Sequence, residues 1–134
     1  MINLTHLLVR GVGERARVQV QGPVRMAPRS VPQPDLALLR QRSYMREGAI
    51  TTDALLVIEV ADSSLQYDST VKLRLYARAG IAEHWIVDAN GEALEVYRSP
   101  SGNRYAEHRH LGLGETVSPL AFPDAVIPID SIFA

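Results

Sequence analysis

The segment that most limits what this chain can fold into is ALLVIEVA (Ala54–Ala61). It is apolar on both faces of an extended chain, and such strands lie at the centre of a sheet that is covered on both sides. Glu59 stands in the middle of this segment. A carboxylate inside an apolar strand is costly unless it is paired, bound to a cation or placed where the strand meets solvent. The segment therefore predicts a layered fold with an ionisable group in or near its core.

Helical and extended patterns alternate along the rest of the chain, and the order of the elements predicts an α/β or α+β sandwich with a mixed sheet. One domain over residues 1–134 accounts for the length. The polar loop 41–53 is either functional or mobile, and the proline-punctuated tail after Gly114 packs over the sheet. We expect a helix over 4–9 that ends near Gly11 and Gly13, followed by strands around 18–20 and at 35–40. A second helix over 67–79 should end at Gly80. Strands at 83–89, 93–99 and 104–112 follow, with a hairpin at Asn90-Gly91.

Composition excludes several classes of protein. Hydrophobic residues make up 46% of the chain, but no apolar run approaches the roughly 18 residues of a membrane span. The N-terminus lacks the pattern of a signal peptide, and the chain has no cysteine for a disulfide or a thiolate metal site. We therefore expect a cytoplasmic protein with no membrane partner.

Charge is divided unevenly along the chain. The net charge is −1, which argues against a generally basic nucleic-acid binder. However, residues 1–46 carry eight arginines and two acidic residues, whereas residues 47–134 carry six basic and thirteen acidic residues. The division is either a solvated surface or a basic wall beside an acidic site. Arg40, Arg42 and Arg46 are either phosphate contacts or solvated loop charges.

Glu59 has a second carboxylate within reach. Asp35 begins the preceding predicted strand, and antiparallel pairing could bring it beside Glu59. Two adjacent carboxylates repel, so they predict a cation between them, and Mg²⁺ or Mn²⁺ suits one or two carboxylates with several waters. Lys72, the one lysine, lies on the following helix and could return across Glu59. The alternative is a structural network of salt bridges.

The residues PDLALL, LLVIEVADSS and YDSTVKLRLYARAGIAEHWIVD together resemble the restriction-endonuclease family called Uma-two, a branch of the PD-(D/E)XK nuclease superfamily. The resemblance covers residues 18–100. It implies a restriction-endonuclease-like core, with a helix before a three-stranded antiparallel meander and then a crossover helix and another strand. It also implies Asp35 and Glu59 as metal ligands, with the backbone carbonyl of Val60 as a third.

The family resemblance also implies the roles of residues near these ligands. The superfamily usually places a lysine two residues after the acid, where this chain has Ala61, so the lysine has moved to the helix as Lys72. Tyr76, one turn later, would support it. Asp62 stands where the family often has serine, and is either an outer metal group or a strand cap.

Three further features complete these expectations. Asp68 either caps the helix, pairs with Lys72 or touches the metal site. The family has a longer N-terminal region, so this chain is expected to lack part of that region. The histidines divide into His84, which we expect to pack in the core, and His108 and His110, which share a strand face and form either a zinc site or a surface pair.

The leading hypothesis is an Mg²⁺- or Mn²⁺-dependent endonuclease with DNA as its partner. Metal-assisted attack of water would hydrolyse the phosphodiester, and pairing into a homodimer would let two sites cut two strands. The alternatives are a non-catalytic nucleic-acid-binding or regulatory module on a nuclease fold, and an inactive truncated or structural member of the family.

Overall fold

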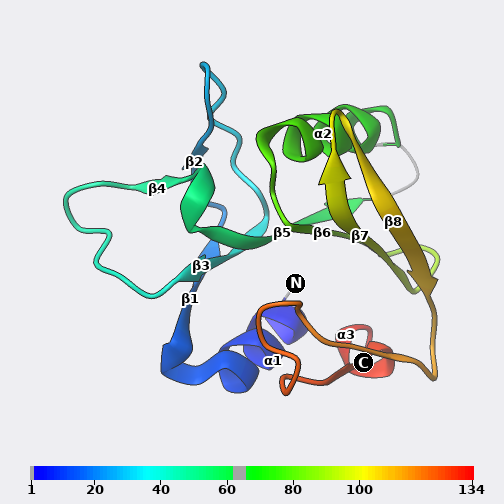
Figure 1. The fold of residues 1–134 in the computed structure, drawn as a ribbon. Coiled ribbons are helices and arrows are strands. Elements are labelled where there is room, and N and C mark those ends of the chain that lie inside the picture. The colour runs from blue at the N-terminus through cyan, green and yellow to red at the C-terminus, as the bar shows by residue number, and fades with distance from the viewer. Residues whose placement is uncertain (1, 62–65) are drawn as a thin grey trace.

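The computed structural model describes residues 2–61 and 66–134. At its centre lies a six-stranded sheet in the order β1-β3-β5-β6-β7-β8 (Figure 1). Its strands are β1 (Ala16–Val20), β3 (Leu36–Arg40), β5 (Ala54–Ala61), β6 (Glu83–Asp88), β7 (Ala93–Ser101) and β8 (Arg104–Leu111). Neighbouring strands are antiparallel except for β5 and β6, which run parallel. The predicted mixed sheet is therefore confirmed, with the apolar strand β5 in its interior.

One face of the sheet is covered by both ends of the chain. The helix α1 (Ile2–Val12) buries Leu4, Leu8 and Val12, which recur every four residues and so form one stripe. The tail contributes β9 (Thr116–Val117), β10 (Ile127–Pro128) and α3 (Ile129–Ile132). Figure 1 shows α1, α3 and this tail together beneath the sheet. The tail thus closes the larger apolar core, as predicted.

The opposite face carries α2 (Gln66–Ala79), which connects the parallel strands β5 and β6. Gly80 adopts φ +81°, a conformation that glycine reaches without steric cost. The amide of Ile81 donates to the carbonyl of Tyr76 over 3.1 Å and that of Gly80 to Ala77 over 3.0 Å. These two bonds form a Schellman motif, so the predicted helix end at Gly80 is confirmed.

Two short strands outside the main sheet were not predicted. β2 (Val24–Arg25) pairs in parallel with β4 (Ala49–Ile50), and the 3₁₀ turn η2 (Thr51–Asp53) joins β4 to β5. A second such turn, η1 (Gly13–Arg15), joins α1 to β1. The polar segment 41–53 is therefore partly ordered by its pairing with residues near 24, which a local pattern cannot reveal.

The β6–β7 hairpin forms where Asn90-Gly91 predicts it, although its turn has a different construction. Residues 89–92 separate the paired strands, and the left-handed residue is Glu92, with φ +50°. The amide of Gly91 donates to Oδ1 of Asp88 over 3.0 Å. The aspartate side chain therefore stabilises a longer turn than the two-residue type that Asn-Gly favours.

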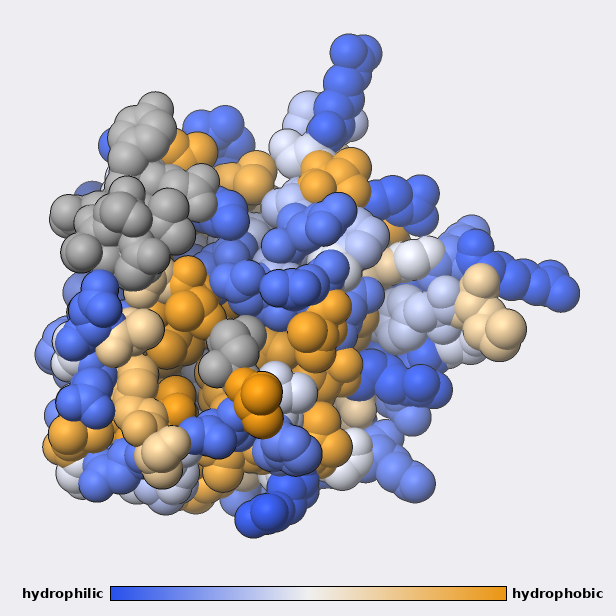
Figure 2. All heavy atoms as spheres, turned by 180° about the vertical axis from the view of Figure 1, so that it is seen from behind, coloured by the Kyte–Doolittle hydropathy of each residue, from blue (hydrophilic) through white to orange (hydrophobic). Residues whose placement is uncertain are grey.

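The molecular surface is polar with local apolar areas. On the face seen in Figure 2, apolar residues gather around a hollow in the lower half, while hydrophilic side chains project from the upper and outer parts. Among the described residues, no helix has the length and apolar character needed to span a membrane.

Candidate functional site

Glu59 lies on the α2 side of strand β5 and is 4% exposed. Val57, on the same side, belongs to the apolar cluster under α2, whereas Leu56 and Ile58 point to the opposite core. The hydroxyl of Tyr76 donates to Oε2 of Glu59 over 2.5 Å. The carboxylate in the apolar strand is therefore buried and bonded to a residue of α2.

Asp35 precedes β3 and lies next to Glu59. Leu36 pairs with Ile58 across the antiparallel strands β3 and β5, so the residue before Leu36 lies level with Glu59. Oδ2 of the half-buried Asp35 accepts a hydrogen bond from the amide of Val60 over 2.8 Å. The structure thus brings together the two carboxylates that antiparallel pairing was expected to place side by side.

Lys72 and Tyr76 approach Glu59 from one face of α2, because residues four apart lie one turn above each other. Nζ of Lys72 is 3.4 Å from Oε1 of Glu59, and the lysine side chain is 32% exposed. Tyr76 is fully buried in the cluster under α2. The lysine is thus the more solvent-accessible of the two partners, as a group that must meet an incoming ligand would be.

Burial raises the pKa of Glu59 above its ordinary value. The hydrogen bond from Tyr76 and the positive charge of Lys72 oppose that rise, whereas the negative charge of Asp35 adds to it. Folding therefore disfavours ionisation of Glu59 even though two donors contact it. A carboxylate with this balance gains from an additional cation, because a cation favours the ionised form.

The donor set at this point suits a hard divalent cation. Carboxylate oxygens of Asp35 and Glu59 are ligands that Mg²⁺ accepts while it keeps several waters. The part of the chain that the structure describes contains no group of three or more His, Cys, Asp or Glu residues arranged to hold a metal. The two carboxylates therefore fit a metal that uses few protein ligands, and they do not fit a closed structural metal site.

Three other residues were expected at the site: Val60, Asp62 and Asp68. The amide of Val60 is bonded to Asp35, and a role for its carbonyl stays a prediction. Asp62 lies outside the described residues, as does the side chain of Asp68 on α2. Ala61, in the position where the superfamily usually has lysine, ends strand β5.

A cavity of about 630 Å³ lies beside this cluster rather than over it. It opens where β5 and β6 end, under the first turns of α2. Its lining mixes apolar and polar groups and includes Ala61, Leu73, Ile86, Asp88 and Tyr97. Asp35, Glu59 and Lys72 do not line it. We rank the carboxylate cluster above the cavity as the chemical site, because the cluster holds the perturbed acid and the adjacent cation.

His108 and His110 share a strand face, as expected, and both bind Glu95 on the neighbouring strand β7. Nε2 of His108 lies 2.6 Å from Oε1 of Glu95, and Nδ1 of His110 lies 2.5 Å from Oε2. Each histidine thus uses a different oxygen of one carboxylate. The three residues are not arranged as a metal group, so the structure favours the surface pair over the zinc site.

Sequence reasoning missed two buried carboxylates, and no local signal marks either of them. Glu83 is fully buried and accepts bonds of 2.8 Å from the Trp85 indole, the Arg98 guanidinium and the Leu120 amide. It therefore ties β6 to β7 and to the tail. Asp53, also fully buried, forms ion pairs with two arginines.

His84 packs in the core, as expected. It is fully buried and lies 4.9 Å from the ring of Tyr76, edge to face. Its Nδ1 lies 3.0 Å from the carbonyl of Val57, so Nδ1 must carry the proton. Among the described residues, Nε2 has no hydrogen-bond partner. Burial lowers the pKa of His84 to about 4, which keeps the ring neutral beneath the carboxylate cluster.

Comparisons with known proteins identify the family and the fold. A family profile, Uma2, described as "Putative restriction endonuclease", matches residues 2–130. A crystal structure of a putative nuclease belonging to DUF820 from Anabaena variabilis ATCC 29413 superposes with a TM-score of 0.75 and 16% identity, over 98% of this chain and 76% of that chain. At this identity the likeness establishes the fold.

A weaker likeness concerns a cryoEM structure of a DrdV–DNA complex. It has a TM-score of 0.48 and 13% identity, and covers 79% of this chain and 9% of that one. No curated protein matches the chain. Because the family profile spans nearly the whole sequence, the chain belongs to the Uma-two restriction-endonuclease family.

Proposed function

We propose that this protein is a metal-dependent endonuclease that hydrolyses phosphodiester bonds in DNA. The observation that carries the proposal is the meeting of Asp35, Glu59 and Lys72 on one face of the sheet. Phosphodiester hydrolysis needs a cation near the attacked phosphate and a group that orients or deprotonates water. Membership of the family supports a nuclease rather than another class of hydrolase.

Each residue has a distinct task in this proposal. Asp35 and Glu59 would hold the cation, which would supply Lewis-acid polarisation of the phosphodiester. Tyr76 holds the carboxylate of Glu59 in one orientation through its 2.5 Å bond. Lys72 leaves Glu59 and stabilises negative charge on the phosphate or orients the attacking water. Water adds to phosphorus, one P–O bond breaks, and the products carry a phosphate and a hydroxyl.

The experiment is nicking of supercoiled plasmid at low salt with Mg²⁺ or Mn²⁺. Glu59→Gln and Lys72→Ala should each abolish nicking that the wild type performs. Asp124→Asn is the matched control, because Asp124 is an exposed carboxylate bonded to Arg15 on the opposite layer. Nicking that survives in Glu59→Gln would contradict the proposal. Equal fluorescence of Trp85 in all variants verifies folding.

A second candidate is a nucleic-acid-binding module without catalysis. Glu59 is 4% exposed, and both Tyr76 and Lys72 already contact it. A carboxylate satisfied in this way can act as a structural group. This candidate predicts salt-dependent binding to DNA with no cleavage in either metal.

A further inference from the structure

The last residue of β3, Arg40, and the segments that flank this strand form an arginine-bearing extension, here called the arm, which consists of residues 21–34 and 40–53. Pairing of β2 with β4 holds the two segments together, and Oγ1 of Thr51 donates to the carbonyl of Arg25 over 3.3 Å. Figure 1 shows the arm on the same side of the sheet as α2. The arm and α2 therefore stand on the face that carries Glu59.

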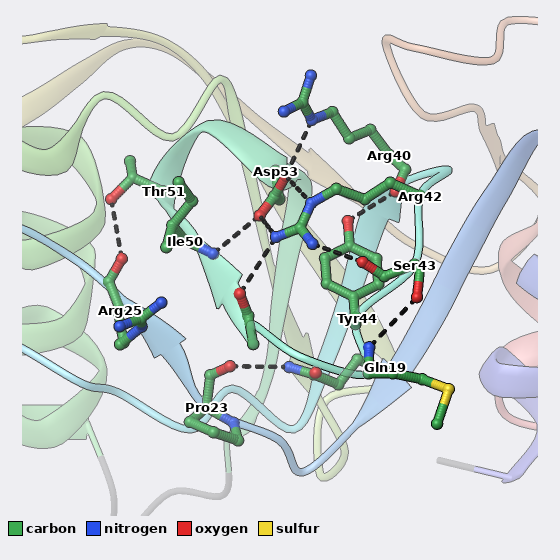
Figure 3. A network of polar contacts seen from close by, with 12 residues as sticks. Gln19, Pro23, Arg25, Arg40, Arg42, Ser43, Tyr44, Ile50, Thr51 and Asp53 are labelled. Carbon is green, nitrogen blue, oxygen red and sulfur yellow. Dashed lines mark hydrogen bonds and ion pairs between the residues drawn. The ribbon is translucent and has the colours of Figure 1, made fainter.

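A buried aspartate fixes the shape of the arm (Figure 3). Asp53 is fully buried, and its carboxylate accepts from the Arg42 guanidinium at 3.0 and 2.6 Å, from Nε of Arg40 at 2.9 Å and from the amide of Ile50 at 3.0 Å. The Arg42 guanidinium also lies over the Tyr44 ring, 3.9 Å from its centroid. Arg42 is therefore a structural residue, and segment 41–53 is held rather than loose.

The arm stays positive, because its five arginines outnumber its two carboxylates, the buried Asp53 and the exposed Glu47. The Arg40 side chain is 57% exposed and contacts Asp53 only through Nε. Figure 3 shows its outer nitrogens directed away from Asp53. Arg25, Arg29 and Arg46 are also exposed, and within the described ranges none of the three has an ion pair. The arm thus presents several guanidiniums to solvent around a rigid centre.

The root of the arm lies at the carboxylate cluster. The amide of Gln21 donates to the carbonyl of Asp35 over 3.0 Å. On the underside of the arm, Val24, Met26 and Ala49 pack in the same cluster as Tyr76, the residue that bonds to Glu59. A polyanion with one phosphate on a cation held by Asp35 and Glu59 would therefore have neighbouring phosphates beside the arm.

We propose that the arm binds the phosphate backbone of duplex DNA on one side of the carboxylate cluster, through Arg29, Arg40 and Arg46. This inference rests on the proposed nuclease function for its substrate. Guanidiniums match phosphate oxygens with two parallel hydrogen bonds. The net charge of −1 does not oppose this, because positive charge is concentrated in the arm, while thirteen of the fifteen acidic residues lie in residues 47–134.

The test measures binding without cleavage. A fluorescent 20-base-pair duplex is titrated with protein in EDTA, by anisotropy, at several NaCl concentrations. The double variant Arg29→Gln/Arg46→Gln is compared with Arg10→Gln/Arg109→Gln, which removes the same charge from α1 and from β8 beside the tail. The arm variant should weaken binding about tenfold and reduce the slope of log K against log salt by about 1.8, because each lost phosphate contact removes about 0.9. The control pair should change affinity less than twofold.

The outcomes separate this inference from the proposed function. Equal weakening by both double variants would show a general charge effect and overturn the arm as the contact surface, and so would absence of binding by the wild type at low salt. Arm-dependent binding without Mg²⁺-dependent nicking would support the arm and reject the nuclease. Nicking that is unaffected by the arm variant would support the nuclease and overturn the arm as the contact surface. Arm-dependent binding to an RNA duplex in preference to DNA would overturn the choice of DNA.

Discussion

Glu59→Gln removes the charge of a carboxylate that is 4% exposed and keeps an oxygen that can accept the hydrogen bond from Tyr76. Because burial raises the pKa of Glu59, the ionised form weakens the fold at neutral pH despite its two donors. We expect Glu59→Gln to be more stable than the wild type by about 1 kcal/mol at pH 8, the energy scale of ordinary carboxyl shifts. If instead the pair of Glu59 and Lys72 stabilises the fold, Glu59→Gln should be less stable than the wild type, by about 3–5 kcal/mol.

The pH dependence of stability tests independently whether ionised Glu59 weakens the fold. A carboxyl whose pKa is raised on folding contributes stability that is fully present below its ordinary pKa, 4.5 for Glu59, and that is lost as pH rises through the folded pKa. The wild type should therefore lose stability relative to Glu59→Gln between pH 4.5 and neutral pH. The difference between the two proteins cancels the titration of groups that they share.

Urea unfolding followed by tryptophan fluorescence measures both effects. Trp85 is the one tryptophan and is fully buried, so its emission reports the core. A Glu59→Gln protein that is less stable than the wild type by more than about 1 kcal/mol, to the same extent at pH 5 and pH 8, would refute the reasoning. Asp124→Asn, at an exposed carboxylate, should differ little from the wild type.

Added metal extends the same experiment. A ligand that binds only the folded state stabilises it by about 2.7 kcal/mol at 100 times its Kd. Mg²⁺ or Mn²⁺ should therefore stabilise the wild type against urea and leave Glu59→Gln unchanged. Equal stabilisation of both proteins would place the metal elsewhere.

Three further outcomes follow from the buried ionisable groups. Asp53→Asn should lower the unfolding free energy by about 2 kcal/mol at neutral pH. The ion pairs hold the pKa of Asp53 well below its ordinary 3.8, so the difference from the wild type should shrink only in strong acid. Urea unfolding at several pH values measures this difference. Glu83→Ala should cost about 3–5 kcal/mol, since it leaves the guanidinium of Arg98 without its partner, and a thermal melt that matches the wild type would contradict this role. His84→Phe should flatten the pH profile of stability. Burial lowers the pKa of His84 from 6.5 to about 4, so the wild type keeps its full stability above pH 6.5. It should lose about 3 kcal/mol of unfolding free energy as the pH falls towards 4, and the variant should not.

Local sequence patterns predicted the main elements, and they allowed Asp35 and Lys72 to meet Glu59, while the roles of these residues came from the family resemblance. The apolar run fixed β5 inside the sheet, because a strand without a polar face must be covered on both sides. The strand alternation and antiparallel order of β3 and β5 then placed Asp35 and Glu59 on one face. The spacing of Lys72 and Tyr76 placed both on one side of α2. These features depend on periods of two and 3.6 residues, which the sequence displays directly.

Long-range packing decided the rest. Asp53 has Arg40 and Arg42 nearby in sequence, yet its burial depends on the pairing of β2 with β4. Glu95 meets His108 and His110 only because of the register of β7 and β8. The sequence by itself determined which residues alternate and where Gly80 ends α2 and the turn at Asn90-Gly91 separates β6 from β7, since these follow from backbone geometry. The tertiary structure decided which charges are buried together, because that choice depends on the packing of segments distant in the chain.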